Sequence, residues 1–537
     1  MVKNKISCYY IFISLLLSAC GESYSPKTSI GNDGKFFNYI SMDDKKFKDG
    51  ESDFYPMIMN YSIDVHAIQG ENNTSAFIAP RAGYHPNYGG GETESITPWG
   101  DDTAKTHATI KSHFTAIKEM GFNTLRITGF TASDFYDEGK GFHTWSRINL
   151  SNTPEGNKNI VKNITPLIKT TLRYAEENGL RVILLISAIE NQSDNQLNLY
   201  SKLAKELKYE KALMAYDLYN EPLYFDRGNY TKQQTKAFVE SYNSSIKKEA
   251  PNHLTTIGLS HYKIVQEWDP ELMDVDFLSF HIYPYGSKNL NRLERFDSKL
   301  YWISKNITKP WIIGETGLNT AENCVPLNLS CGNYSNQLYF MSYSLNICRS
   351  AGSSGYSWWS FQDLKFRPGK IEGTCNVSDY GLVNRKNTFY LSSTGDTILG
   401  ELKHDIKTLP FKKFVNDAPY RSNYWDDIPK PEDSHYYNID YLPGHEKAKG
   451  IIIGENGSPV QDAIVTLHNT VSNSRYSTFT KPDGTFTLNT GWTNIFTKLD
   501  FKLKVTGVKM ETLEIPLKNI YEGDGNKFKD IVLKRFN

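Results

Sequence analysis

Two short motifs each place a glutamate directly after an apolar, strand-like run. One run, "ALMAYDLYNEP", ends at Asn220, Glu221 and Pro222, and another, "KPWIIGETG", ends at Glu315. A single carboxylate at a strand end is commonplace, because charged residues usually stay in contact with water there. Two carboxylates far apart in the sequence could instead act together, as proton donor and as nucleophile or base, if the fold unites the strand ends.

Such a pair meets the demands of glycosidic bond cleavage. That reaction needs one protonated carboxyl group for the leaving oxygen and one ionised carboxylate that attacks the sugar or activates water. Pro222 and the nearby aromatic residues would limit the hydration of Glu221 and so raise its pKa. The sequence therefore makes Glu221 and Glu315 candidate catalytic residues.

Eight apolar, strand-like segments must position these residues. They cover residues 54–61, 123–130, 180–188, 211–220, 254–260, 275–283, 309–316 and 354–361. Helical spacing occurs between most of them, over residues 103–121, 164–179, 197–208, 232–250 and 334–350. Apolar strands with intervening helices indicate a parallel sheet covered on both faces, and eight repeats predict a (β/α)8 barrel. A doubly wound sheet is the alternative, but it would need a glycine-rich loop after the first strand, and the glycine run at 89–91 opens no clear helix.

The C-terminal ends of barrel strands line the active site in this fold. The polar and aromatic residues at these ends are Asn60, Arg126, Asn220, Glu221, His281, Tyr283, Glu315 and Trp359. Each supporting residue also has a purely structural interpretation. Arg126 could be an ion-paired core arginine and His281 a buried structural histidine, whereas Tyr283 and Trp359 could simply pack. Asn60 could contact the substrate or cap its strand.

Four motifs together resemble the retaining glycoside hydrolases of clan A, closest in style to family 5: "DLYNEP", "SFHIYP", "WIIGETG" and "GYSWWSF". The resemblance implies a double displacement in which Glu221 is the acid/base and Glu315 is the nucleophile. It also implies that Asn220 binds the 2-hydroxyl group of the sugar.

The same resemblance assigns the remaining residues at the strand ends. It implies that Arg126 and Tyr283 orient Glu315 and hold it ionised, and that His281 lies in the same network. Trp359 would form the floor of the sugar subsite closest to the cleaved bond. One feature departs from family 5, which usually carries a histidine at the end of the third strand, because "VILLISAIE" (182–190) has none. Related clan A families that act on β-galactosides or β-mannosides therefore stay open.

The expected substrate is a β-linked poly- or oligosaccharide, and neither a metal nor an organic cofactor is expected. Aromatic residues make up 13% of the chain and suit carbohydrate stacking. A non-catalytic surface glycan-binding lipoprotein is one alternative, although a pure binder has no need of the carboxylate pair. A transglycosylase that uses the same residues is another. Further subsites could involve the loop aromatics Tyr84, Tyr88, Trp99, Tyr224, Phe225 and Tyr285.

The N-terminus resembles a bacterial lipoprotein signal. Lys3 and Lys5 precede an apolar run over residues 6–17, which is too short to span a bilayer, and "LSAC" then ends at Cys20. We expect a signal peptide over residues 1–19, an acylated Cys20 and a tether over residues 20–49. This predicts a lipoprotein of the bacterial outer membrane, on the cell surface or the periplasmic face. An ordinary secretory signal is the alternative.

Charge and cysteine content narrow the remaining classes. Lys and Arg total 60, as do Asp and Glu, so the chain has no basic field for nucleic acid, and we expect a monomer without a nucleic-acid partner. Disulfides are possible in an exported protein, but the sequence leaves the pairing open. The cysteines in question are Cys324, Cys331, Cys348 and Cys375.

The C-terminal part follows a different pattern. A catalytic domain over residues 50–425 would be followed by a linker rich in Pro, Asp and Tyr over residues 426–447. From residue 448 to 537, short alternating strands and the turn Pro482-Asp483-Gly484 predict a small β-sandwich. "NGSPVQDAIVTL", "KPDGTF" and "KVTGV" resemble the carboxypeptidase regulatory-like module.

Overall fold

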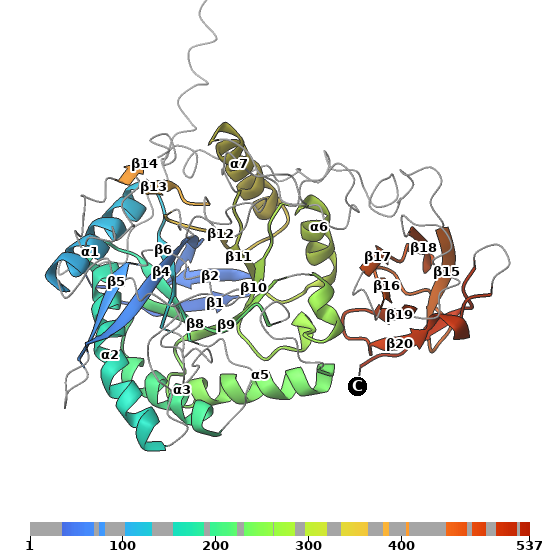
Figure 1. Cartoon of the computed structure of the whole chain (residues 1–537), viewed down its shortest axis with the longest axis horizontal. Coiled ribbons are helices and arrows are strands. Elements are labelled where there is room, and N and C mark those ends of the chain that lie inside the picture. Colours follow the sequence, from blue (N-terminus) through green and yellow to red (C-terminus); the bar gives the residue numbers. More distant parts are fainter. Residues whose placement is uncertain are drawn as a thin grey trace, which may run out of the picture.

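The structure is a computed structural model of the chain. It describes residues 35–68, 75–80, 103–130, 154–186, 194–222, 230–260, 262–284, 296–318, 334–362, 380–385, 404–406, 447–469, 475–489, 501–522 and 527–536. A barrel surrounded by helices forms the larger part, and a group of β-sheets near the C-terminus lies at its side (Figure 1).

Eight parallel strands form a ring. In ring order they are β4 (Met57–Ile68), β6 (Thr124–Thr128), β7 (Arg181–Leu185), β8 (Leu213–Asn220), β9 (Leu254–Leu259), β10 (Leu278–His281), β11 (Trp311–Glu315) and β12 (Tyr356–Trp358). The ring closes between β11 and β12, where Ile313 N donates to Gly355 O over 3.1 Å and Ser354 N donates to Trp311 O over 2.7 Å. The predicted (β/α)8 barrel is confirmed, and each predicted strand segment overlaps one of the eight strands, although β4 continues seven residues beyond its predicted end.

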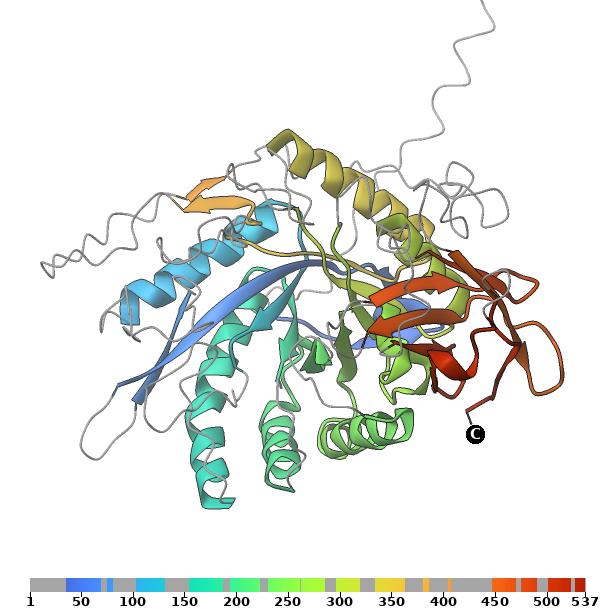
Figure 2. The same cartoon turned by 45° about the vertical axis from the view of Figure 1, so that its right-hand side comes forward.

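Helices cover the outside of the ring (Figures 1 and 2). They are α1 (Thr103–Glu119), α2 (Pro154–Glu177), α3 (Asp194–Leu207), α5 (Lys232–Lys247), α6 (Phe296–Asn306) and α7 (Tyr334–Ser350). The sequence analysis did not include α6, which is short. Its buried residues Phe296, Leu300 and Ile303 nevertheless have helical spacing. In the described residues between β9 and β10 the helical elements are two 3₁₀ turns, η1 (Tyr262–Gln266) and η2 (Pro270–Leu272).

A small antiparallel sheet covers the floor of the barrel, at the N-terminal ends of its strands. Its strands are β1 (Ile40–Asp43), β2 (Lys46–Asp49) and β3 (Ser52–Phe54). Ile40 and Phe47 of this sheet are buried in one cluster with Ile58, Phe277 and Ile312, which lie at the N-terminal ends of β4, β10 and β11. The predicted tether therefore reaches too far, because residues 40–49 bury apolar side chains and belong to the folded barrel.

Two further pairs of strands accompany the barrel. β5 (Ser75–Pro80) pairs antiparallel with the end of β4, so the rim at this strand is extended by a hairpin. β13 (Val383–Arg385) and β14 (His404–Ile406) pair with each other. None of the described helices is both long and apolar enough to cross a membrane.

The C-terminal residues form two sheets around a shared core. One sheet has the order β18 (Thr485–Asn489), β15 (Lys447–Gly454) and β21 (Ile531–Leu533). The other has the order β17 (Arg475–Phe479), β16 (Ile464–Asn469), β19 (Phe501–Thr506) and β20 (Leu513–Pro516), which leads into η6 (Leu517–Asn519). Leu467, Leu503, Phe486 and Phe528 lie buried between them. The predicted β-sandwich is confirmed, whereas its resemblance to the carboxypeptidase regulatory-like module stays a prediction.

The sandwich packs against the barrel beside the two short 3₁₀ turns. The indole of Trp302 in α6 stacks on Phe479, with ring centroids 6.1 Å apart, and its Nε1 donates to Asp462 O over 3.2 Å. The buried ammonium of Lys232 donates to Asp269 and to Gly507 O, each over 2.8 Å. The sandwich therefore covers the barrel wall at the connection between β9 and β10. The neighbouring connections place a helix, α5 or α6, over the corresponding part of the wall.

Candidate active site

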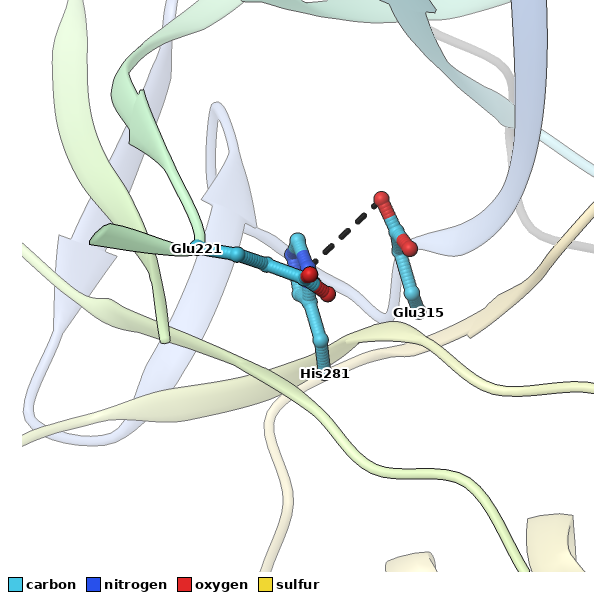
Figure 3. A group of neighbouring side chains, drawn as sticks. All are labelled: Glu221, His281 and Glu315. Carbon is cyan, nitrogen blue, oxygen red and sulfur yellow. Dashed lines mark hydrogen bonds and ion pairs between the residues drawn. The ribbon is translucent and has the colours of Figure 1, made fainter. Parts of the chain in front are cut away.

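The ends of β8, β10 and β11 bring Glu221, His281 and Glu315 together. His281 Nδ1 lies 2.9 Å from Glu221 Oε1 and 3.5 Å from Glu315 Oε1. One ligand atom from each of the three residues lies within 4.8 Å of the other two. Figure 3 shows the three side chains pointing into one space. The two glutamates that the sequence singled out are therefore direct neighbours.

Irregular strand ends aim these side chains. The pairing of β8 with β9 shifts between Asp217 and Asn220, and that of β10 with β11 shifts between Phe280 and His281. In a regular strand, residues three apart point to opposite faces, so the shift lets both Asp217 and Asn220 face the barrel interior. Glu221 follows with a φ of 49°, a left-handed conformation that is uncommon for a residue other than glycine. Local backbone geometry thus turns the Glu221 side chain toward Glu315.

Two glycines make room for the imidazole of His281. A Cβ atom on Gly258 would lie 2.8 Å from His281 Cε1, and one on Gly314 would lie 3.0 Å from His281 Cδ2. Gly258 and Gly314 come from the strands on either side of β10, so His281 occupies a slot between them. Neither position tolerates a larger side chain without moving the ring.

Arg126 of β6 connects four strands from inside the barrel. Its Nη1 donates to Glu315 Oε1 over 2.6 Å and to Asn60 Oδ1 over 3.1 Å, while Nη2 donates to Asn220 Oδ1 over 2.8 Å. Its Nε donates to Asp217 Oδ2 over 2.8 Å. Burial disfavours the guanidinium charge, but the ion pairs with Asp217 and Glu315 outweigh that effect and raise its pKa above the ordinary value.

Tyr283 supplies the second donor to Glu315. Its hydroxyl group donates to Glu315 Oε2 over 2.9 Å, so both oxygens of this carboxylate accept hydrogen bonds. Burial, together with the negative charge of Glu315, raises the pKa of Tyr283 well above its ordinary value. Tyr283 is therefore a neutral hydrogen-bond donor throughout the physiological range.

Glu221 and His281 have strongly shifted pKa values. Burial raises the pKa of Glu221 to about 7, against the opposing effect of the Arg126 charge. Burial also lowers the pKa of His281 to about 4, and the negative charge of Glu315 offsets this only in part. At neutral pH the imidazole is therefore uncharged, and the contact with Glu221 is a hydrogen bond rather than an ion pair. The two glutamates thus have different environments, as an acid and a nucleophile require.

Two of the other predicted site residues, Asn220 and Trp359, lie at the rim of the barrel. Asn220 uses Oδ1 to accept from Arg126, and its amide nitrogen makes no hydrogen bond with any described residue, so it can donate to a sugar. Trp359 is half-buried at the rim, where its backbone N donates to Thr316 O over 2.7 Å. The neighbouring Trp358 is buried against Phe340 of α7, on the outside of the ring.

Asn60 does not lie on the substrate face. It is fully buried, and its amide nitrogen donates to Gly314 O, Ser357 Oγ and Trp358 O over 3.0, 2.6 and 3.1 Å. All of its hydrogen-bonding capacity is therefore used within the barrel, where it links β4 to β11 and β12. The expectation of a substrate-binding Asn60 is corrected to a supporting role.

Asp217 is a buried charged residue at the site that the sequence analysis did not single out. It lies inside β8, has no exposed surface and contacts Arg126. An acidic residue within an otherwise apolar strand is unusual, and this was the available signal. It was overlooked because regular alternation would place Asp217 and Asn220 on opposite faces.

Several expectations concern residues outside the described part of the chain. These are Cys20, the loop aromatics Tyr84, Tyr88, Trp99, Tyr224, Phe225 and Tyr285, and the cysteines Cys324, Cys331 and Cys375. Cys348 is described, and it is a buried free thiol in α7. Burial raises its pKa, so it is a poor nucleophile.

A metal could in principle use the same three side chains. Glu221, His281 and Glu315 are the only group of this kind among the described residues. Both oxygens of Glu315, however, already accept from Arg126 and Tyr283. A cation would have to compete with the guanidinium for that carboxylate, so the donor set suits proton transfer and nucleophilic attack better than metal binding.

Comparison with known proteins identifies the family. The Cellulase model, which describes glycosyl hydrolase family 5, matches residues 81–364, more than half of the 537 residues. That range contains both glutamates and every supporting residue except Asn60. No curated protein matches the sequence of this chain.

The solved structures similar to this chain include several β-glucuronidases. The enzyme of Ruminococcus gnavus is 14% identical, with a TM-score of 0.40 over 65% of this chain and 50% of that one. Bacteroides uniformis β-glucuronidase 2, covalently bound to cyclophellitol-6-carboxylate aziridine, is 13% identical, with a TM-score of 0.43 over 93% of this chain and 49% of that one. The FMN-binding β-glucuronidase of Facaelibacterium prausnitzii L2-6 is 13% identical, with a TM-score of 0.44 over 90% and 59%.

The chain thus spans between 49 and 59% of the length of these enzymes, and likeness at this level carries no inference on substrate. The family model and the eight-stranded barrel, by contrast, agree on the nature of the protein. The chain belongs to glycoside hydrolase family 5 and is a glycoside hydrolase of clan A.

Proposed function

We propose that the protein hydrolyses β-glycosidic bonds of a poly- or oligosaccharide with net retention, with Glu315 as the nucleophile and Glu221 as the acid/base. The observation that carries this proposal is the short separation of the two carboxylates, whose nearest oxygens lie within 4.8 Å. Retaining enzymes place the two groups about 5–5.5 Å apart, whereas inverting enzymes need about 6.5–9.5 Å to admit a water molecule.

In the first step, Glu315 attacks the anomeric carbon while the bond to the leaving oxygen breaks. Glu221 gives its proton to that oxygen, so the aglycone leaves as a neutral alcohol. The raised pKa of Glu221, about 7, supports this role because the group still holds a proton near neutral pH. The donors Arg126 and Tyr283 support the role of Glu315, because both bind an ionised carboxylate.

In the second step, the glycosyl-enzyme ester is hydrolysed. The ionised Glu221 takes a proton from a water molecule as the water attacks the anomeric carbon, and Glu315 leaves as a carboxylate. Asn220 would hold the sugar through its amide nitrogen in both steps, and Trp359 would lie under the sugar ring. Neither step requires a cofactor.

The test is a panel of β-glycans and of 4-nitrophenyl β-glucosides, β-galactosides and β-mannosides, assayed with the wild type, Glu221→Gln and Glu315→Gln. We expect Glu315→Gln to lose activity by a factor of about 10³ or more, because the nucleophile is gone. NMR of the first-formed product should show the β-anomer. A wild-type rate in Glu315→Gln, or an α-anomer as first product, contradicts the proposal.

The panel also separates the alternatives. Transfer of the glycosyl group to an added sugar, in preference to water, would indicate a transglycosylase. Binding of a glycan by calorimetry without any turnover would indicate a surface glycan-binding protein. Either result would replace the hydrolytic proposal, because product analysis detects transfer and calorimetry detects binding without turnover.

For its location, we propose a lipoprotein held by an acylated Cys20 in the outer membrane of a bacterium. The short apolar run before "LSAC" supports this proposal. A soluble glycan would then be cleaved outside the cytoplasm.

A further inference from the structure

Asp217 lies inside β8, four residues before Glu221, and has no exposed surface. The only hydrogen bond of its carboxylate to a described residue comes from Arg126 Nε, which donates to Oδ2 over 2.8 Å. The other oxygen, Oδ1, is buried without a partner among the described residues. A half-satisfied buried carboxylate is expensive in folding free energy, so its presence beside the site calls for a functional reason.

The guanidinium group of Arg126 binds Asp217 through one nitrogen and residues at the rim through the other two. Nη1 donates to Glu315 Oε1 over 2.6 Å, as well as to the buried Asn60, and Nη2 donates to Asn220 Oδ1 over 2.8 Å, so each terminal nitrogen binds a residue at the rim. The third nitrogen, Nε, donates to Asp217, which is buried beneath the rim. Because the guanidinium is planar, a bond at Nε fixes the plane in which both terminal nitrogens lie.

Asp217 also sets the charge of the buried site. Arg126 is the one cation within this group, and it faces two carboxylates, Asp217 and Glu315, whose side chains are 0 and 8% exposed. His281 is neutral near pH 7 and adds no positive charge. If Asp217 were neutral, Glu315 would have the full guanidinium charge to itself and would be a weaker nucleophile.

We propose that Asp217 is a positioning residue for hydrolysis, which orients Arg126 toward Glu315 and Asn220 and keeps the guanidinium from fully neutralising the nucleophile. This inference rests on the proposed function. Asp217 does not touch the substrate, since it lies beneath the rim. Its effect passes through Arg126.

The test compares Asp217→Asn with a matched control, Asp49→Asn. Asp49 also pairs with a buried arginine, since Arg181 Nη2 donates to Asp49 Oδ2 over 2.7 Å, but this pair lies at the floor of the barrel. Both variants keep the shape of the side chain and lose one charge. Kinetics are measured with the 4-nitrophenyl β-glycoside that the wild type cleaves fastest, over a range of pH.

For Asp217→Asn we expect kcat to fall about 10- to 100-fold, with KM changed less than about threefold, because the lost interaction serves the reaction rather than binding. Removal of a negative charge also favours ionised Glu221. The basic limb of the pH profile should therefore move down by about 0.5–1 pH unit. Asp49→Asn should keep the kcat and the pH profile of the wild type.

A wild-type kcat and pH profile in Asp217→Asn overturns the proposal, and so does an equal loss in both variants. If Asp217→Asn does not fold, Asp217→Glu carries the test. Its longer side chain displaces Arg126 but keeps the charge, so kcat should fall while the basic limb stays in place, and a wild-type kcat contradicts the positioning role. Failure of the proposed function would be seen separately, as full activity of Glu315→Gln.

Discussion

At the scale of single residues, burial gives two similar glutamates different environments. Among the described residues no cation donates a hydrogen bond to Glu221, and burial raises its pKa to about 7. Glu315, by contrast, accepts hydrogen bonds from both Arg126 and Tyr283. Near pH 7 Glu221 therefore still holds a proton in part of the molecules, as its proposed role of acid requires.

This difference predicts the pH dependence of the reaction. In the proposed mechanism the protonated form of Glu221 is the active one in the first step, so kcat/KM should be retained below pH 7 and fall about tenfold per unit above it. The measurement is kcat/KM for a 4-nitrophenyl β-glycoside between about pH 5 and 9, which covers about two pH units on either side of the pKa of Glu221.

A 2,4-dinitrophenyl glycoside of the same sugar is the control for that profile. Its leaving group departs without a proton, so the basic limb should be weaker or absent. A limb of equal steepness with both substrates would mean that a group other than the acid titrates there.

At the scale of elements, the connection between β9 and β10 differs from the others. The helical elements among its described residues are η1 and η2, and the sheet of β16, β17 and β19 packs beside it. Gln266 at the end of η1 donates from Nε2 to Thr466 Oγ1 over 3.2 Å, and Lys504 forms an ion pair with Glu267. The sandwich thus contributes to the wall of the catalytic barrel, and we expect the two parts to unfold together.

Trp302 offers the sharpest test of this coupling. Its side chain is fully buried where α6 packs against Phe479 of the sandwich. Trp302→Ala should therefore lower the free energy of unfolding by about 3–5 kcal/mol. Tyr209, whose side chain is largely exposed, is the matched aromatic control, and Tyr209→Ala should change stability little. Urea denaturation followed by far-UV circular dichroism measures both, and equal stabilities of the two variants would contradict the coupling.

At the scale of the whole molecule, the N-terminal segment and the site lie at opposite ends of the barrel. Phe36 N donates to Glu176 at the end of α2, and Arg181 at the start of β7 lies over the Phe36 ring, 3.6 Å from its centroid. Both contacts are at the floor, whereas Glu221 and Glu315 follow the opposite strand ends. The first residues that the structure describes therefore lie on the side of the barrel away from the site.

This arrangement predicts that the proposed anchor can be removed without loss of catalysis. Cys20→Ser should shift the protein from the membrane fraction to the soluble fraction, while kcat/KM on a soluble glycan stays within about twofold, because the floor contacts are intact. Mass spectrometry of the wild-type N-terminal peptide should show the acyl chains. An unmodified peptide, or a Cys20→Ser protein that remains in the membrane, rejects the anchor.

Several features follow from the sequence by itself. Runs such as "RVILL" and "WIIGE" are almost entirely apolar, as is typical of a strand buried on both faces. Eight such runs with intervening helices indicate the barrel and the rim position of Glu221 and Glu315. The turn Pro482-Asp483-Gly484 follows in the same way, since Asp483 Oδ1 accepts from Thr485 N over 2.9 Å and Gly484 has a φ of 76°. These are local patterns, and their physical causes act over a few residues.

Other features were decided only by the tertiary structure. The shift of pairing within β8 turns Asp217 and Asn220 to the same side, and this depends on the neighbouring strand β9 rather than on the local sequence. Burial of Asn60 and the raised pKa of Glu221 depend on side chains that distant segments bring into the barrel. Sequence periodicity determines which residues face inward, whereas solvent exclusion and the partners of each charge arise only once the ring has closed.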